Sequence, residues 1–204
     1  PLSLLHLNQA LKYVDTTTQN ALGENVKPFK RDVTFNLLRA NVKWAKCNSA
    51  TSNVLKNLNK AAALYSIVLK KYDKTNVFAA NGLGMVLALS GKFDAAYDVF
   101  SAVREGDTDV SHVWIHLGHI CIARGDLKKA TRLYQQASNR FFSGKNAKVL
   151  LYLANAWYLV AQSDVTFQRK RGANEEALST LERALALEPD SVHVKHALAR
   201  TLET

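Results

Sequence analysis

The chain has 204 residues, of which 48% are hydrophobic, with 9 glycines and 3 prolines, a composition that favours helices over a turn-rich β fold. No segment approaches the roughly 18 consecutive apolar residues of a membrane span, so a membrane partner is not expected. The net charge is +10, and residues 1–75 carry 12 Lys and Arg against 4 Asp and Glu, a net charge of +8. This basic N-terminal third indicates an acidic peptide or a nucleic acid as partner, with a solvated face as the simpler explanation.

The first 75 residues are predicted to form two pairs of helices. Residues 1–32 indicate a degenerate pair, and residues 34–75 indicate a second pair that carries an insertion. Apolar and small residues at helical spacing mark the two helices of the second pair: Leu37, Ala40 and Trp44, then Ala61, Tyr65 and Val68. The polar stretch between these two groups is the predicted insertion.

Residues 76–110 and 111–146 repeat one pattern at a spacing of 34 residues. In the second copy, W-x2-L-G is followed by a turn glycine and then by A-x3-Y-x2-A, at Trp114, Leu117, Gly118, Gly125, Ala130, Tyr134 and Ala137. The first copy has the same phase at Ala80, Leu83, Gly84, Gly91, Ala96 and Phe100. Two copies in phase indicate tetratricopeptide repeats (TPR), in which small residues let two antiparallel helices approach and large residues fill the gaps.

Two further elements complete the predicted array. Residues 147–190 indicate another pair, whose second helix is read in EEALSTLERALALEPD, after a basic insert around VTFQRKRGANE that is predicted to be a loop. Residues 192–204 indicate a lone first helix. Because one pair of helices cannot bury its own apolar face, the pairs must stack. The chain is therefore predicted to be all-α, a right-handed superhelix formed by a single TPR array over residues 1–204.

The stretch SHVWIHLGHICIARGD holds three histidines and a cysteine, which raises the question of a metal site. His112, His116 and His119 lie on one face of a helix, but the outer two are about 10 Å apart, so one ion cannot bind all three. We interpret them instead as lining the inner wall of the superhelix. Cys121 is predicted to be a small core residue, and Arg-Gly-Asp at 124–126 is predicted to be the turn between two helices.

The sequence contains no catalytic motif and no cofactor-binding loop, so neither an enzyme nor a cofactor is predicted and function is expected to lie in surfaces. First helices of TPR arrays line a concave wall that binds partners. By phase, this predicted wall includes the following residues: Phe78, Asn81, Met85, His112, Ile115, His119, Ile122, Asn155, Tyr158 and Leu159. A basic surface that could hold phosphates or an acidic peptide, with a solvated face as the alternative, is predicted at these residues: Lys128, Lys129, Arg132, Arg169, Lys170 and Arg171.

Residues 60–160 carry features that the TPR consensus does not explain. They are AANG before the Leu-Gly pair, DVFSAVRE closing one repeat, DVSHVWIHLGHI opening the next, and the join NRFFSGKNAKVLLYLA. In these pieces the chain resembles the large TPR scaffold subunit of the RNA polymerase II-associated factor (PAF) transcription elongation complex. The resemblance implies a nuclear scaffold without catalytic activity, whose partners are the other PAF subunits and RNA polymerase II. It further implies a role in elongation and in transcription-linked histone modification.

Two other functions stay open at this point. A TPR adaptor of another pathway, such as protein quality control or trafficking, would bind linear peptides. A basic helical-repeat protein would bind nucleic acid through its N-terminal third, with an affinity that falls steeply as salt rises.

Overall fold

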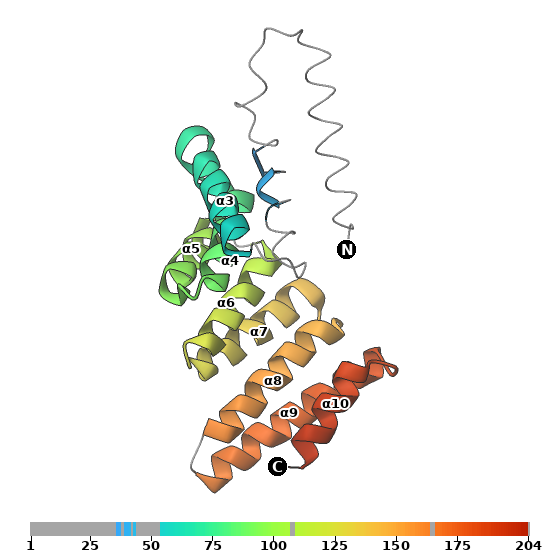
Figure 1. Ribbon diagram of the computed structural model, residues 1–204. Helices are drawn as coiled ribbons and strands as arrows, with labels where there is room; N and C mark the ends of the chain where they lie inside the picture. The colour runs from blue at the N-terminus through green and yellow to red at the C-terminus, as the bar shows by residue number, and fades with distance from the viewer. Residues whose placement is uncertain are drawn as a thin grey trace, which may run out of the picture. The chain divides into compact units, whose positions relative to one another are not determined.

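The computed structural model describes residues 36, 37, 39–41, 43, 54–106, 109–163 and 166–203, and all regular elements within them are helices (Figure 1). The chain divides into two compact units, Pro1–Gly106 and Asp107–Thr204. The predicted all-α TPR fold is confirmed.

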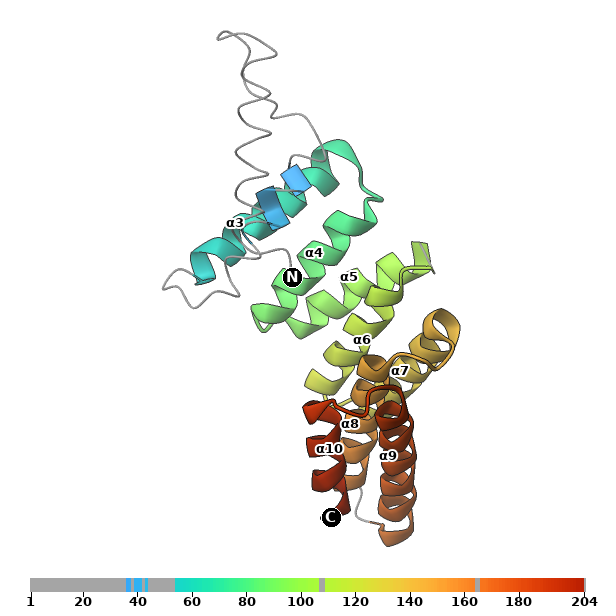
Figure 2. The ribbon, with the colours of Figure 1, turned by 90° about the vertical axis from the view of Figure 1, so that its right-hand side faces the viewer.

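The first unit contains helix α3 (Val54–Ile67), which continues into a π-helical turn η1 (Val68–Tyr72), followed by α4 (Val77–Leu89) and α5 (Phe93–Gly106) (Figure 2). Helix α4 packs against both α3 and α5. The residues predicted to face the core from the second helix of the 34–75 pair are all buried: Ala61, Tyr65 and Val68. The Tyr65 hydroxyl donates to Asn41 Oδ1 at 2.6 Å, so α3 is tied to the helical residues before it.

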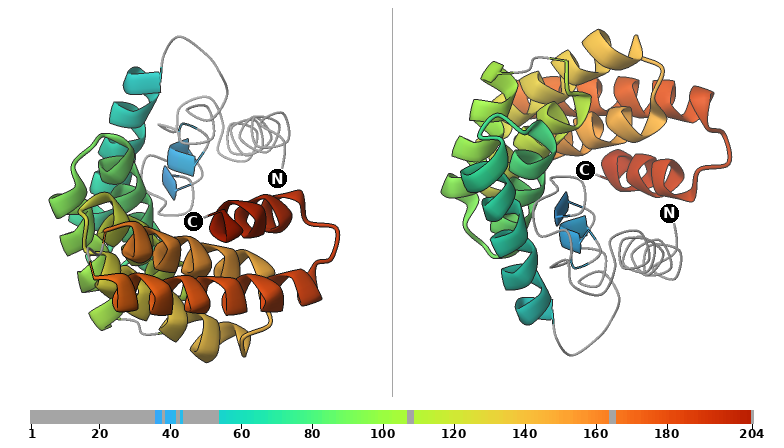
Figure 3. Two further views of the ribbon diagram at one scale, coloured as in Figure 1. Left: turned by 90° about the horizontal axis from the view of Figure 1, so that it is seen from below. Right: turned by 90° about the horizontal axis from the view of Figure 1, so that it is seen from above.

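The second unit contains α6 (Ser111–Ala123), α7 (Leu127–Phe142), α8 (Ala147–Ser163), α9 (Phe167–Leu187) and α10 (Val192–Leu202). Consecutive helices pack side by side, and α10 contacts both α9 and α8 (Figure 3). One core cluster joins α8, α9 and α10 around Leu150, Leu181 and Val194. The predicted lone first helix is therefore docked on the preceding pair.

Glycines make the turns within the α4–α5 and α6–α7 pairs, as their positions predicted. Gly91 links α4 to α5 with a φ of 75°, and Gly125 links α6 to α7 with a φ of 82°. These left-handed conformations strain residues that carry a Cβ, whereas glycine adopts them freely. The triplet 124–126 is therefore a helix-to-helix turn.

Close packing in the α4–α5 and α6–α7 pairs depends on a glycine that faces an aromatic ring. A Cβ added to Gly118 would lie 2.5 Å from Cε1 of Tyr134, and a Cβ added to Gly84 would lie 2.6 Å from Cε1 of Phe100. Both aromatic side chains are almost completely buried. The predicted complementarity of small and large residues thus holds in both in-phase repeats.

The basic insert was wrongly predicted to be a loop. Helix α9 has 21 residues and begins at Phe167, so Arg169, Lys170 and Arg171 belong to its first turns. The segment contains no proline, and Arg171 pairs with Glu175 four residues later at 2.9 Å, the spacing at which opposite charges support a helix. The α8–α9 hairpin is consequently longer than the α6–α7 hairpin, whose helices have 13 and 16 residues.

Candidate protein-binding site

The predicted wall residues of the first unit lie on α4 and are reachable from solvent. The side chain of Phe78 is 76% exposed, and Asn81 and Met85 are partly buried. The α4 helix is held from its start by Asn76, whose side chain accepts a hydrogen bond from the backbone N–H of Ala79 at 2.9 Å. The capped helix α4 thus presents the large apolar side chain of Phe78 to solvent, outside the core.

In the second unit, the predicted wall residues lie on α6 and α8, and none is fully buried. His112 and His119 are exposed, whereas the others are partly buried: Ile115, Ile122, Asn155, Tyr158 and Leu159. The two helices meet where the ring of His119 lies edge-on to Tyr152, with centroids 4.7 Å apart. Whether a partner contacts these side chains remains a prediction.

His119 links this wall to the packing beneath it. Its Nδ1 shares a 2.6 Å hydrogen bond with the hydroxyl of Tyr134, the ring that fills the space opposite Gly118. Burial raises the pKa of the Tyr134 hydroxyl, so this group stays protonated and can donate to the imidazole. Sequence periodicity placed His119 on the wall, but it did not predict this bond.

Two of the three histidines in α6 are held neutral at physiological pH. Burial, followed by the neighbouring charges of His119 and His112, lowers the pKa of His116 to about 4. Desolvation of the ring, and then the positive charge of Lys148, lowers the pKa of His119. The wall therefore offers neutral imidazoles, which can donate or accept hydrogen bonds without attracting anions.

Arg200 of α10 adds a cation to the wall that sequence reasoning missed. Its guanidinium donates to Asn155 Oδ1 at 2.8 Å and lies 4.3 Å from the ring centroid of Tyr158. Both partners are predicted wall residues, so a ligand on this part of α8 would also meet Arg200. No pattern in the sequence identifies the contact, because it joins residues 45 positions apart.

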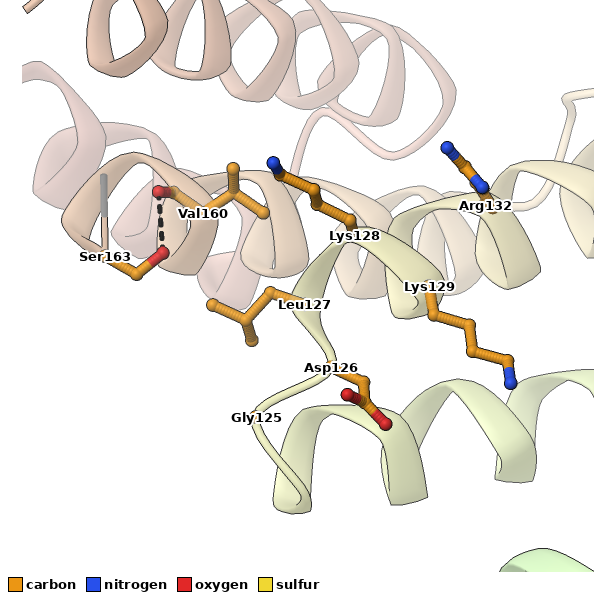
Figure 4. A pocket seen from close by; sticks show the side chains of 8 residues that line it. All are labelled: Gly125, Asp126, Leu127, Lys128, Lys129, Arg132, Val160 and Ser163. Atoms are coloured by element: carbon orange, nitrogen blue, oxygen red, sulfur yellow. Dashed lines mark hydrogen bonds between the residues drawn. The ribbon is translucent and has the colours of Figure 1, made fainter. Parts of the chain in front are cut away.

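The predicted basic residues come from the starts of two helices. Lys128, Lys129 and Arg132 are exposed on the first turns of α7, where they line a pocket of about 860 Å³ together with residues from the end of α8 (Figure 4). Arg169, Lys170 and Arg171 lie on α9 and are not among the described residues of that lining.

Three further features of the described residues concern metal ligands, the cysteine of α6 and the length of apolar helices. Within it, no group of three or more His, Cys, Asp and Glu side chains is placed to hold a metal ion. Cys121 is buried inside α6, as its core position predicted. None of the described helices is long and apolar enough to span a membrane. The basic N-terminal third lies mostly outside the described residues.

Comparison with known proteins identifies both the repeat and its relatives. Residues 113–140 match a family model described as tetratricopeptide repeat. The chain is 33% identical over 152 residues to the protein CTR9 homolog of Arabidopsis thaliana. It is 31% identical over 148 residues to the RNA polymerase-associated protein CTR9 of Caenorhabditis elegans. Each match covers 72% of this chain, but only 13% and 12% of the respective relative.

The fold has a close counterpart among solved structures. A thermophilic TPR protein of Thermus thermophilus aligns with 99% of this chain and 93% of its own, with a TM-score of 0.63 and 18% sequence identity. The predicted resemblance to the TPR subunit of the PAF complex is confirmed by the CTR9 matches. This chain is thus a tetratricopeptide-repeat protein similar to CTR9.

Proposed function

We propose that the chain is a non-enzymatic scaffold that acts in RNA polymerase II transcription elongation and in the histone modification linked to it. Its partners are then the other subunits of a PAF-type complex and the polymerase, and its location is the nucleus. The observation that carries this proposal is the identity of 31–33% with CTR9 proteins over about 150 residues. The relatives are much longer than this chain, so the role of the whole protein is part of the proposal.

The described surfaces support a binding function. The predicted wall keeps ten side chains accessible on α4, α6 and α8, including one exposed aromatic ring, Phe78. Large exposed aromatic side chains are typical anchors of protein interfaces. We propose that these ten residues contact the other scaffold subunits.

Co-purification tests the proposal directly. The full-length protein, tagged and expressed in its own cells, is recovered from nuclear extract and its partners are quantified by mass spectrometry. PAF subunits and RNA polymerase II should be enriched over an unrelated tagged nuclear protein. Their repeated absence, or a recovery dominated by chaperones or trafficking proteins, would refute the proposal.

A pair of matched variants tests the wall within the same experiment. Phe78→Ser removes an apolar side chain that is 76% exposed, and Leu55→Ser removes one on α3 that is 74% exposed. Neither change opens the core, so both variants should fold. We expect only Phe78→Ser to reduce recovery of a PAF subunit. An equal effect of both variants would contradict the assignment of the wall.

A further inference from the structure

A continuous groove runs between the first half of α7 and the last turns of α8. Figure 4 shows the residues that line the pocket of about 860 Å³. This pocket shares Lys128, Arg132 and Val160 with a second hollow of about 420 Å³, which is lined by the same two helices. We call the two together the α7–α8 groove. All of its described lining residues belong to the second unit: 125–129, 131, 132, 135, 136, 157, 160 and 163.

The groove lies where the α6–α7 turn and the first turns of α7 meet the last turns of α8. Val160 and Ala161 of α8 form a buried cluster with Ala173 of α9, and Leu127, the first residue of α7, packs against this cluster. Residues 167–172 form the part of α9 that precedes Ala173.

The groove combines a basic rim with an apolar floor. Lys128, Lys129 and Arg132 are exposed along one side, and Val160 and the half-buried ring of Trp157 lie along the other. Figure 4 shows the Lys128 side chain extending toward Val160. Gln135 and Gln136 add amide groups at the far end of the groove.

Two cations of this rim, Lys128 and Arg132, form no ion pair within the described part of the chain. Asp126 is the one carboxylate among the described lining residues, and it lies 3.9 Å from Arg124. No described carboxylate lies within 4.0 Å of the charged groups of Lys128 or Arg132. Arg169 and Lys170 lie in the first turn of α9, before Ala173 of the cluster against which Leu127 packs.

We propose that the α7–α8 groove binds an acidic linear peptide, in which Asp and Glu side chains contact the rim and one apolar side chain lies on Val160 and Trp157. This inference rests on the proposed scaffold function and deepens it, because it names the chemical class of one partner. An apolar floor beside cations suits such a peptide. A single-stranded nucleic acid would instead need successive rings on which bases stack, and Trp157 is the one aromatic residue among the described lining residues.

Fluorescence anisotropy with the purified 204-residue chain tests the proposal. The probe is a labelled peptide of about 12 residues, with Asp and Glu around a central Leu. Two comparison probes separate the alternatives: the same peptide with Asn and Gln in place of the acids, and a single-stranded DNA oligonucleotide of equal charge. Binding of the acidic peptide should exceed that of the amide peptide and should weaken as salt is added.

Charge reversal locates the binding. Lys128→Glu with Arg132→Glu should weaken binding of the acidic peptide about tenfold or more, because two attractive contacts become repulsive. The matched control is Lys145→Glu with Lys195→Glu, which changes the net charge equally at two exposed cations elsewhere in the second unit and should alter affinity less than about twofold. The neutral pair Lys128→Gln with Arg132→Gln gives an intermediate value and introduces no new charge.

Three results would overturn the proposal. They are equal binding of the acidic and amide peptides, an equal loss in both charge-reversed pairs, and tighter binding of the oligonucleotide that the groove variants abolish. The last result would make the groove a nucleic-acid site. The assay uses a synthetic peptide and the purified chain, so a negative result would refute the groove proposal without affecting the co-purification result. A negative co-purification result would likewise leave the peptide-binding measurement valid.

Discussion

Replacing Gly118 with Ala should destabilise the second unit, although the same change usually strengthens a helix. The new Cβ would lie 2.5, 2.6 and 2.9 Å from three ring carbons of Tyr134, closer than carbon atoms approach in proteins. The ring would have to move, which costs about 1–3 kcal/mol by overpacking. Its hydrogen bond to His119 would be weakened as well, at about 1 kcal/mol.

The opposing effect is the better helix propensity of Ala, which contributes about 1 kcal/mol. The net expected loss in the free energy of unfolding is therefore about 1–3 kcal/mol. Urea unfolding followed by circular dichroism measures it, with an unchanged m-value as evidence that the same surface is exposed. Gly172→Ala is the matched control, because a Cβ there would meet nothing within 4 Å inside α9, and it should raise stability. If both variants become more stable, the close contact between Gly118 and Tyr134 does not exclude a larger side chain at position 118, and the reasoning is refuted.

Three further predictions concern the second unit. His116 has a pKa of about 4 in the folded state and 6.5 in the unfolded state, so the unfolded state binds the proton more readily. The free energy of unfolding should therefore stay constant above pH 6.5 and fall by about 1–3 kcal/mol as the pH is lowered toward 4. In His116→Gln this dependence on pH should be weaker. Arg200→Ala removes the contacts to Asn155 and Tyr158, and hydrogen exchange should become faster in α10 and remain unchanged in α6. Asn146→Ala removes the side-chain acceptor for the backbone N–H of Val149, so the free energy of unfolding should fall by about 1 kcal/mol in thermal unfolding. A variant as stable as the parent would contradict this prediction.

The repeat could be predicted from sequence because its signals are local and periodic. Gly118 and Tyr134 lie 16 positions apart, within one helical pair, and the 34-residue phase places them opposite each other. The turn at Gly125 follows from the same phase. Each residue type at these positions satisfies a packing or backbone requirement that the sequence displays directly.

The start of α9 could not be predicted in the same way. A run of charged residues followed by Gly172 has weak apolar periodicity, so it resembles a loop when read alone. In the structure Ala173 belongs to one buried cluster with Val160 and Ala161 of α8, and α9 includes the charged run before it. Helix propensity is a weak guide where packing of a neighbouring residue decides the boundary.

The candidate site shows the same division between local and long-range information. The wall positions followed from helical phase, whereas Arg200 reaches them only because α10 docks beside α8. The six basic residues were predicted to form one basic surface. In the structure Lys128, Lys129 and Arg132 line the pocket beside α8, whereas Arg169, Lys170 and Arg171 belong to the first turns of α9 and are not in its described lining.

The bond between Tyr134 and His119 has a consequence for how a bound partner is sensed. Tyr134 is buried inside its repeat, where its ring packs against Gly118, whereas His119 lies on the surface and bonds to the Tyr134 hydroxyl. A ligand that immobilises the His119 imidazole also restricts the Tyr134 ring, which packs α7 against Gly118 of α6. Binding at the wall would then reduce local opening of α7, a helix that the ligand does not contact. Slower amide hydrogen exchange along α7 would report this effect.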